Sequence, residues 1–172
     1  MKKIPILFAV CIYAMSAMAC TRDKGFQQPP NKNDSIVSAA LGDSIFSIIM
    51  NAKYITAEII DNADTIKKET KAAKLSKDRA DIIKFLLENP DNVASNDTVF
   101  GLFMPNAIFT FIHKKQELRL YFDYGLKKWQ INDADDKPLK MFDLKSREFL
   151  RLAQAIFPDD EYFNKLIKKM GL

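Results

Sequence analysis

The sequence predicts an α+β fold, in which an antiparallel β-meander of about five strands is flanked by N-terminal and C-terminal helices. Two observations support this prediction. Apolar residues recur at helical spacing in segments before residue 90 and again after residue 143. Between them, 97–142 alternates apolar with polar residues and is interrupted by short turn signals, which is typical of antiparallel hairpins.

The first helical region is predicted over 35–52, where apolar residues recur every three or four positions. Asp34 or Ser35 is a suitable N-cap, because a short polar side chain accepts a hydrogen bond from a backbone N–H of the first turn. Gly42 is expected to weaken this helix or to break it. The next segment, 54–60, is rich in β-branched residues and predicts a strand.

Further helices are predicted on both sides of the meander. Ser76 is expected to cap a helix that ends before Pro90, because the residue before a proline disfavours helical geometry. After the meander, 144–156 carries one apolar stripe and predicts another helix. Pro158 is expected to occupy the first position of a last helix, and Gly171 to cap its end.

The meander is predicted to have one register, with turns at 105–106, 115–116 and 124–125 and a loop over 133–137. In this register one face of the sheet is apolar and forms the core, with Trp129 pointing inward. A shift of one residue in any hairpin would place charged side chains on that face. The predicted cross-strand pairs are Leu102–Phe109, Phe111–Leu120, Leu120–Trp129, Ile131–Leu139 and Trp129–Met141.

The opposite face of the predicted sheet is less polar than a solvent-facing surface usually is. Its apolar and aromatic members are taken as a candidate binding face: Phe103, Ile108, Ile112 and Tyr121. Two interpretations stay open. Either a helix covers part of this face, or the face is a binding groove.

The N-terminus has the features of a secretory signal peptide. The first three residues, MKK, are followed by an apolar run over 4–19 that ends in small residues. This run of 16 residues is shorter than the ~20 that a membrane-spanning helix needs. Cleavage is expected between Ala19 and Cys20.

The stretch Ala17-Met18-Ala19-Cys20 resembles the lipobox of bacterial lipoproteins, in which a cysteine directly follows the cleavage site. Ala17 stands where that family generally has leucine or another branched aliphatic residue. The resemblance is confined to this segment, and 35–172 carries no motif of a characterised family. It implies a diacylglycerol on the Cys20 sulfur and an acyl chain on its amine, which together anchor a protein stably.

The resemblance also implies an extracytoplasmic, membrane-anchored location. Thr21 follows the cysteine, and the absence of aspartate there favours the outer membrane. The alternative is a plainly secreted protein cut at the same bond. Cys11 would leave with the signal, so Cys20 would be the only cysteine and would have no disulfide partner. A single thiol is a liability in an oxidising compartment, and lipid attachment removes it.

The predicted organisation is a signal peptide over 1–19, a lipid-anchored tether over 20–34 and a single α+β domain over 35–172. The tether is polar and contains Pro29-Pro30, which is a linker composition. Removal of 1–19 leaves 153 of the 172 residues, with 24 basic and 22 acidic side chains. This charge balance excludes the basic footprint of a nucleic-acid-binding protein.

Catalytic, cofactor-binding and metal-binding motifs are missing from the sequence. His113 is the only histidine and is expected at a strand end, and no G-x-S-x-G elbow is present. The acidic stretch 132–136 lacks the glycine and glutamate that an EF-hand loop requires, which favours a solvated hairpin loop. We therefore expect a protein that is not an enzyme and has no cofactor or metal.

Three functional hypotheses remain. The first is a lipid-anchored envelope protein that binds a protein partner or an envelope component. The second is a binder of a small apolar ligand or glycan on the curved sheet, which an enclosed cavity beside Phe103, Ile108 and Tyr121 would favour. The third is a hydrolase with carboxylate chemistry, which requires two convergent buried carboxylates.

Overall fold

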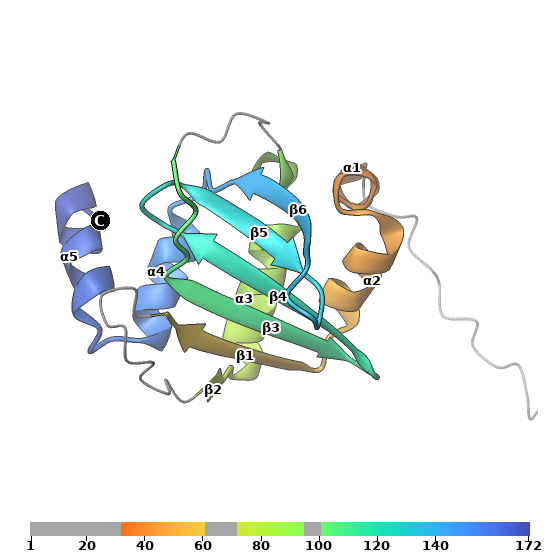
Figure 1. Cartoon of the computed structure of the whole chain (residues 1–172), viewed down its shortest axis with the longest axis horizontal. Coiled ribbons are helices and arrows are strands. Elements are labelled where there is room, and N and C mark those ends of the chain that lie inside the picture. The colour runs from red at the N-terminus through yellow and green to blue at the C-terminus, as the bar shows by residue number, and fades with distance from the viewer. Residues whose placement is uncertain (1–31, 61–71, 95–100) are drawn as a thin grey trace, which may run out of the picture. The chain divides into compact units, whose positions relative to one another are not determined.

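A six-stranded antiparallel sheet organises the computed structural model, which describes residues 32–60, 72–94 and 101–172 (Figure 1). The described residues belong to one compact unit. The sheet order is β2-β1-β3-β4-β5-β6, and β3 to β6 form a meander, so the predicted α+β class is confirmed. The strands are β1 (Tyr54–Ile59), β2 (Ala73–Lys74), β3 (Ala107–His113), β4 (Gln116–Asp123), β5 (Lys128–Asn132) and β6 (Pro138–Asp143).

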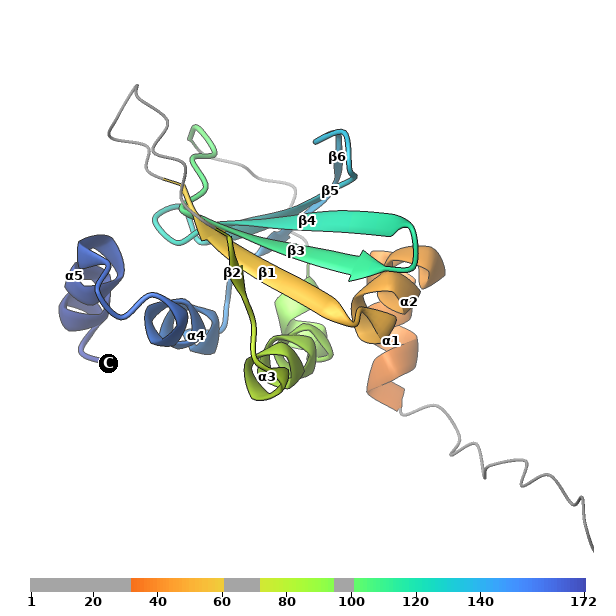
Figure 2. The same ribbon diagram turned by 90° about the horizontal axis from the view of Figure 1, so that it is seen from below.

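The helices lie on one side of this sheet. Figure 2 shows α3, α4 and α5 below one face, with α1 and α2 at one end of the sheet. Their apolar residues therefore meet the inward side chains of the strands and form a single core. The helices are α1 (Lys32–Leu41), α2 (Asp43–Asn51), α3 (Lys77–Leu87), α4 (Glu148–Ile156) and α5 (Glu161–Met170), with a short 3₁₀ helix, η2 (Pro90–Val93).

The predicted N-terminal helix is broken where the glycine stands. Gly42 separates α1 from α2. Its φ is +89°, a value that glycine adopts without a steric penalty. The helical region begins at Lys32, three residues earlier than predicted. The signal peptide, Ala19, Cys20 and most of the predicted tether lie outside the described residues.

Two of the predicted helix ends are confirmed and one is wrong. The Ser76 side chain accepts a hydrogen bond from Arg79 N at 3.4 Å and caps α3, and Gly171 has φ +65° at the end of α5. Pro158, however, precedes α5. The N-cap is Asp160, whose carboxylate accepts from Phe163 N at 3.0 Å and satisfies a free N–H of the first turn.

The predicted faces of β3, β4 and β5 are correct, although two registers are shifted by two residues. Phe111 pairs with Leu118, and Leu120 pairs with Ile131. The cause lies in the turns, which occupy 114–115 and 124–127. Because side chains alternate with period two along a strand, a shift of two residues leaves the same residues on each face.

The predicted strand before β3 is replaced by β1. Ala57 pairs with Phe109, whereas Leu102 is unpaired with any described strand and is 80% exposed. The first part of the segment concerned, 97–100, lies outside the described residues. The strand β1, which is rich in β-branched residues, thus lies beside β3, where the sequence pattern predicted the segment that directly precedes β3 in the chain.

The last strand is shifted by a single residue. A register irregularity between Ile131 and Asn132 pairs Phe142, not Met141, with Trp129. The Phe142 ring stacks on the Trp129 ring at 4.6 Å between centroids, and Leu139 is left 42% exposed. The irregularity therefore brings the larger aromatic side chain of β6 into the core.

Aromatic rings join the sheet to the C-terminal helices. The Phe122 ring contacts those of Phe109, Tyr124, Trp129 and Phe149, with centroid distances of 5.2–6.1 Å. Trp129 is fully buried, as predicted, and its indole N–H donates to the Asn92 carbonyl at 2.9 Å. This satisfied N–H allows a tryptophan to be buried at the centre of the core.

Candidate functional site

The face of the sheet opposite the helices carries a mixed set of side chains that we call the outer sheet face. No described helix crosses this face (Figure 2). Strand pairing places most of its residues in three cross-strand rows, and a fourth row of charged residues lies beyond them. The three rows are Tyr54, Ile112 and Glu117; Thr56, Thr110, Arg119 and Asn132; and Glu58, Ile108, Tyr121, Gln130 and Met141.

The structure brings together three of the four residues predicted as a binding face. Ile108 and Tyr121 are direct cross-strand partners, and Ile112 lies further along β3 on the same face. Phe103 belongs to no strand and lies in the irregular segment that leads to β3, next to Met104, whose N–H donates to Asp123 Oδ2 at 2.7 Å. All four side chains are half-buried, and strand alternation alone was sufficient to place Ile108, Ile112 and Tyr121 on one face of the sheet.

A network of charged side chains borders these residues. Asp136, in the β5–β6 loop, accepts hydrogen bonds from Tyr121 Oη at 2.6 Å and from Arg119 Nη1 at 2.7 Å. Arg119 Nε donates in turn to Glu117 Oε1 at 2.8 Å. We call Glu117, Arg119, Tyr121 and Asp136 the carboxylate network, and it fixes the positions of an arginine and a tyrosine before any ligand binds.

The loop that carries Asp136 is held by the sheet beneath it. Asp136 has φ +61°, and its backbone carbonyl accepts from Asn132 Nδ2 at 3.0 Å. Asp133 accepts from the backbone N–H groups of Asp135 and Lys137 at 3.0 and 2.9 Å. These contacts confirm the predicted hairpin loop and explain why Asp136 points back over β4.

The electrostatics of the network set the protonation states of its members. The hydrogen bonds from Tyr121 and Arg119 lower the pKa of Asp136 below its ordinary value. Burial, followed by the hydrogen bond to Asp136, raises the pKa of Tyr121 to about 12. At neutral pH Asp136 is therefore an anion and a weak base, while Tyr121 is a neutral donor. This arrangement suits recognition by hydrogen bonds.

Three members of this network, Glu117, Arg119 and Asp136, are not among the candidate residues predicted from the sequence. Glu117 and Arg119 precede Tyr121 at spacings of four and two on one strand, so alternation places them on the same face. That signal was present in the sequence. Asp136 gave no such signal, because one residue of an acidic loop cannot be distinguished from its neighbours without the loop conformation.

A buried row of charges lies further along the same face. Lys128 is flanked in the sheet by Asp123 and Asp143, and its ammonium lies 2.6 Å from Asp143 Oδ1. Asp123 accepts from the backbone N–H groups of Met104 and Leu126 at 2.7 and 2.8 Å. Both carboxylates are thus engaged, one in fixing the segment before β3 and the β4–β5 loop and the other in an ion pair.

The histidine lies at the end of β3, as predicted. His113 Nδ1 is 2.8 Å from the carbonyl oxygen of Asn51, at the C-terminal end of α2. Within 32–60, 72–94 and 101–172, no group of three or more histidine, cysteine or acidic side chains is arranged to hold a metal ion. Over those same ranges, none of the helices has the length and apolar character required to cross a bilayer.

Comparison with known proteins adds no relative. No model of a known protein family matches the chain, and no curated protein or solved structure is significantly similar to it. The class of protein is therefore defined by the fold and the site only. This is an α+β domain that covers one face of an antiparallel meander with helices and presents the other face with a preformed carboxylate network.

Proposed function

We propose that this protein is a lipid-anchored protein of the bacterial cell envelope that binds a protein partner through its outer sheet face. The anchor is Cys20, whose context resembles a lipobox. The absence of aspartate after Cys20 favours the outer membrane. The proposed role is non-enzymatic binding.

One observation carries the binding proposal. Half-buried Ile108 and Ile112 lie beside an arginine and a tyrosine that are already held in place by Asp136. Arginine and tyrosine are enriched among the residues that contribute most to protein interfaces. Because the network fixes both side chains before association, less conformational entropy is lost on binding.

A protein partner fits this face better than the alternative ligands do. A small apolar ligand needs an enclosed cavity, and a pocket between the β4–β5 loop and the helices α4 and α5 is lined by none of Phe103, Ile108 and Tyr121. A glycan needs exposed aromatic rings to stack on. Trp129 points into the core, and the exposed Tyr54 ring on this face is covered on one side by Lys74 Nζ, 4.8 Å from the ring centroid. Neighbouring isoleucines and a fixed arginine match a protein surface of mixed polarity.

The anchor is tested by labelled fatty-acid incorporation in the bacterial envelope. Wild-type protein is expected to incorporate the label and Cys20→Ser protein to lose it, because the substitution removes the sulfur and with it the thioether. Expression of both proteins is checked by immunoblot. Equal labelling of the two proteins, or no labelling of either, would contradict the lipid anchor.

The binding face is tested by photo-crosslinking in intact cells with full-length protein. A photoreactive phenylalanine analogue replaces Ile112 and, as a control, Phe85 of α3, which is 72% exposed. We expect an adduct of discrete protein mass at position 112, no such adduct at position 85, and loss of the adduct when Arg119→Ala is added. The Arg119 truncation removes two hydrogen bonds and opens no core cavity.

Other outcomes of the crosslinking would contradict the proposal. Equal adducts at both positions would show that the outer sheet face has no special role. A small mass increase at position 112 would support a glycan or a small ligand. Absence of any adduct at position 112 in cells that contain the folded protein would remove the protein-binding role.

A further inference from the structure

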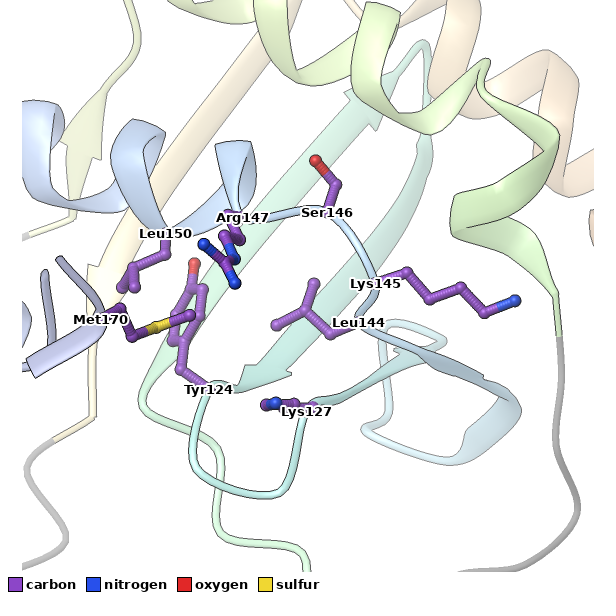
Figure 3. Close-up of a pocket in the computed structure, with 8 residues that line it drawn as sticks. All are labelled: Tyr124, Lys127, Leu144, Lys145, Ser146, Arg147, Leu150 and Met170. Carbon is purple, nitrogen blue, oxygen red and sulfur yellow. The ribbon is translucent and has the colours of Figure 1, made fainter. Parts of the chain in front are cut away.

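A small pocket lies on the helix side of the sheet, away from the outer sheet face. Its volume is about 90 Å³, and its walls come from the β4–β5 loop, the β6–α4 connection and the helices α4 and α5 (Figure 3). None of its lining residues belongs to the outer sheet face or to the carboxylate network. The pocket is therefore a second site, independent of the proposed protein-binding role.

The walls of the pocket are fixed by contacts within the fold. Leu144 N donates to the carbonyl of Lys127 at 2.8 Å and ties the β6–α4 connection to the β4–β5 loop. Tyr124 Oη donates to the Phe149 carbonyl of α4 at 3.2 Å, and the Tyr124 ring meets Phe163 of α5 edge-on at 5.5 Å. Because the Tyr124 hydroxyl is engaged elsewhere, its ring contributes an apolar surface to the pocket.

The rim of the pocket is cationic. Arg147, Lys127 and Lys145 line it, and none of the three makes a side-chain hydrogen bond or an ion pair within the described residues. Arg147 occupies the N-cap position of α4 without capping it through its side chain. Figure 3 shows its guanidinium beside the Tyr124 ring, with Lys127 across from it, whereas Lys145 extends away from the pocket.

The nearby acidic groups leave this positive charge uncompensated. Glu148, next to Arg147, is paired with Arg151 at 3.1 Å, and Asp143 is paired with Lys128 at 2.6 Å. No acidic side chain lines the pocket. A ligand that enters therefore meets unpaired donors at the rim and apolar atoms below them.

We propose that this pocket binds a small organic anion. Its carboxylate or phosphate group would lie against Arg147 and Lys127, since a guanidinium matches the geometry of both groups with paired hydrogen bonds. Its apolar part would rest on Tyr124, Leu150 and Met170, which belong to three different elements. The volume limits this part to a single ring or a short alkyl chain.

Calorimetric titration of the full-length protein in detergent tests the pocket with three probes that share a single phenyl ring. The probes are benzoate, phenyl phosphate and neutral benzyl alcohol, each also titrated into detergent alone. We expect saturable binding of at least one anion, and binding of benzyl alcohol weaker by about tenfold or more, because the charged hydrogen bonds are lost. A preference for benzoate would identify a carboxylic acid as the ligand class, and a preference for phenyl phosphate a phosphate ester.

Matched variants locate the binding. Arg147→Gln is expected to weaken anion binding by about tenfold or more, whereas Lys77→Gln, which removes an exposed cation of α3 outside the pocket, should leave it unchanged. Met170→Ala should weaken the binding of both anions, because it removes part of the apolar wall. Circular dichroism confirms that each variant is folded.

Three results would overturn the proposal. The first is the absence of saturable binding by either anion. The second is unchanged affinity in an Arg147→Gln, Lys127→Gln double variant. The third is equally tight binding of benzyl alcohol, which would show that the cationic rim plays no part.

Discussion

Alanine substitution of two neighbouring residues in β6 distinguishes the register of the structure from the register that the sequence pattern predicts. In the structure, Phe142 faces the core and is 3% exposed, while Met141 lies half-buried on the outer sheet face. The sequence pattern predicts the reverse, with Met141 paired with Trp129. The two substitutions are therefore expected to differ strongly in their effect on stability.

The magnitude follows from the contacts that Phe142 makes. Truncation of a buried phenylalanine to alanine costs about 3–5 kcal/mol, because the transferred area and the cavity left behind both contribute. The stacked pair with Trp129, at 4.6 Å between centroids, accounts for about 0.5–1.5 kcal/mol of this. In a domain of this size Phe142→Ala should lower Tm by about 6–20 °C. Met141→Ala should cost less than about 1 kcal/mol.

Thermal and urea unfolding of the full-length protein in detergent provide the assay. Unfolding is followed by far-UV circular dichroism, because the Trp129 fluorescence itself changes when its stacking partner is removed. Leu139→Ala, on the same strand and 42% exposed, is the matched control. If Met141→Ala destabilised the protein as much as Phe142→Ala, the register irregularity between β5 and β6 would be refuted.

Three further predictions concern local contacts, and each is measured by urea or thermal unfolding. Because Tyr121 and Arg119 lower the folded-state pKa of Asp136, its charge should stabilise the fold above about pH 4 and lose this effect at lower pH. The stabilities of wild type and Asp136→Asn should therefore converge on acidification, and a growing difference between them would contradict the network. Ser76→Ala should cost about 1 kcal/mol through loss of the α3 cap, whereas the neighbouring Lys77→Ala should cost no more than about 0.5 kcal/mol. Gly42→Ala should cost about 1–3 kcal/mol through backbone strain alone, since φ +89° and ψ 139° are almost confined to glycine and an added Cβ meets no atom within 4 Å; an unchanged stability would contradict the positive φ.

The parts of the fold that depend on local chemistry could be predicted from the sequence. Gly42 marked a helix break, Ser76 an N-cap and Gly171 a C-cap, because each of these residue types meets a backbone requirement nearby in the chain. The inward position of Trp129 was also predictable. Alternation fixes which face a side chain takes even when the turn, and with it the pairing partner, is misplaced by two residues.

The parts that depend on distant segments could not be predicted in this way. Nothing in the pattern of β3 shows that its second neighbour is β1 and not the segment just before it. The register irregularity that places Phe142 in the core instead of Met141 also leaves no signal in the sequence, because both residues are apolar. Asp136 joins the candidate site through a loop conformation that depends on Asn132 and Asp133. Each case combines residues whose individual preferences are compatible with several arrangements.

The pairing of β1 with β3 also determines the order in which the domain can assemble. Its paired residues are 48 to 58 positions apart, from Ile59↔Ala107 to Tyr54↔Ile112, whereas β3 to β6 are joined by short connections. Closing a long loop costs more chain entropy than closing a hairpin, so the four-stranded meander is expected to form first and β1 to add to it later. During synthesis α1, α2 and β1 leave the ribosome before their partner strand exists. This N-terminal part of the domain, from α1 to β1, is therefore expected to stay incompletely folded until β3 has been synthesised.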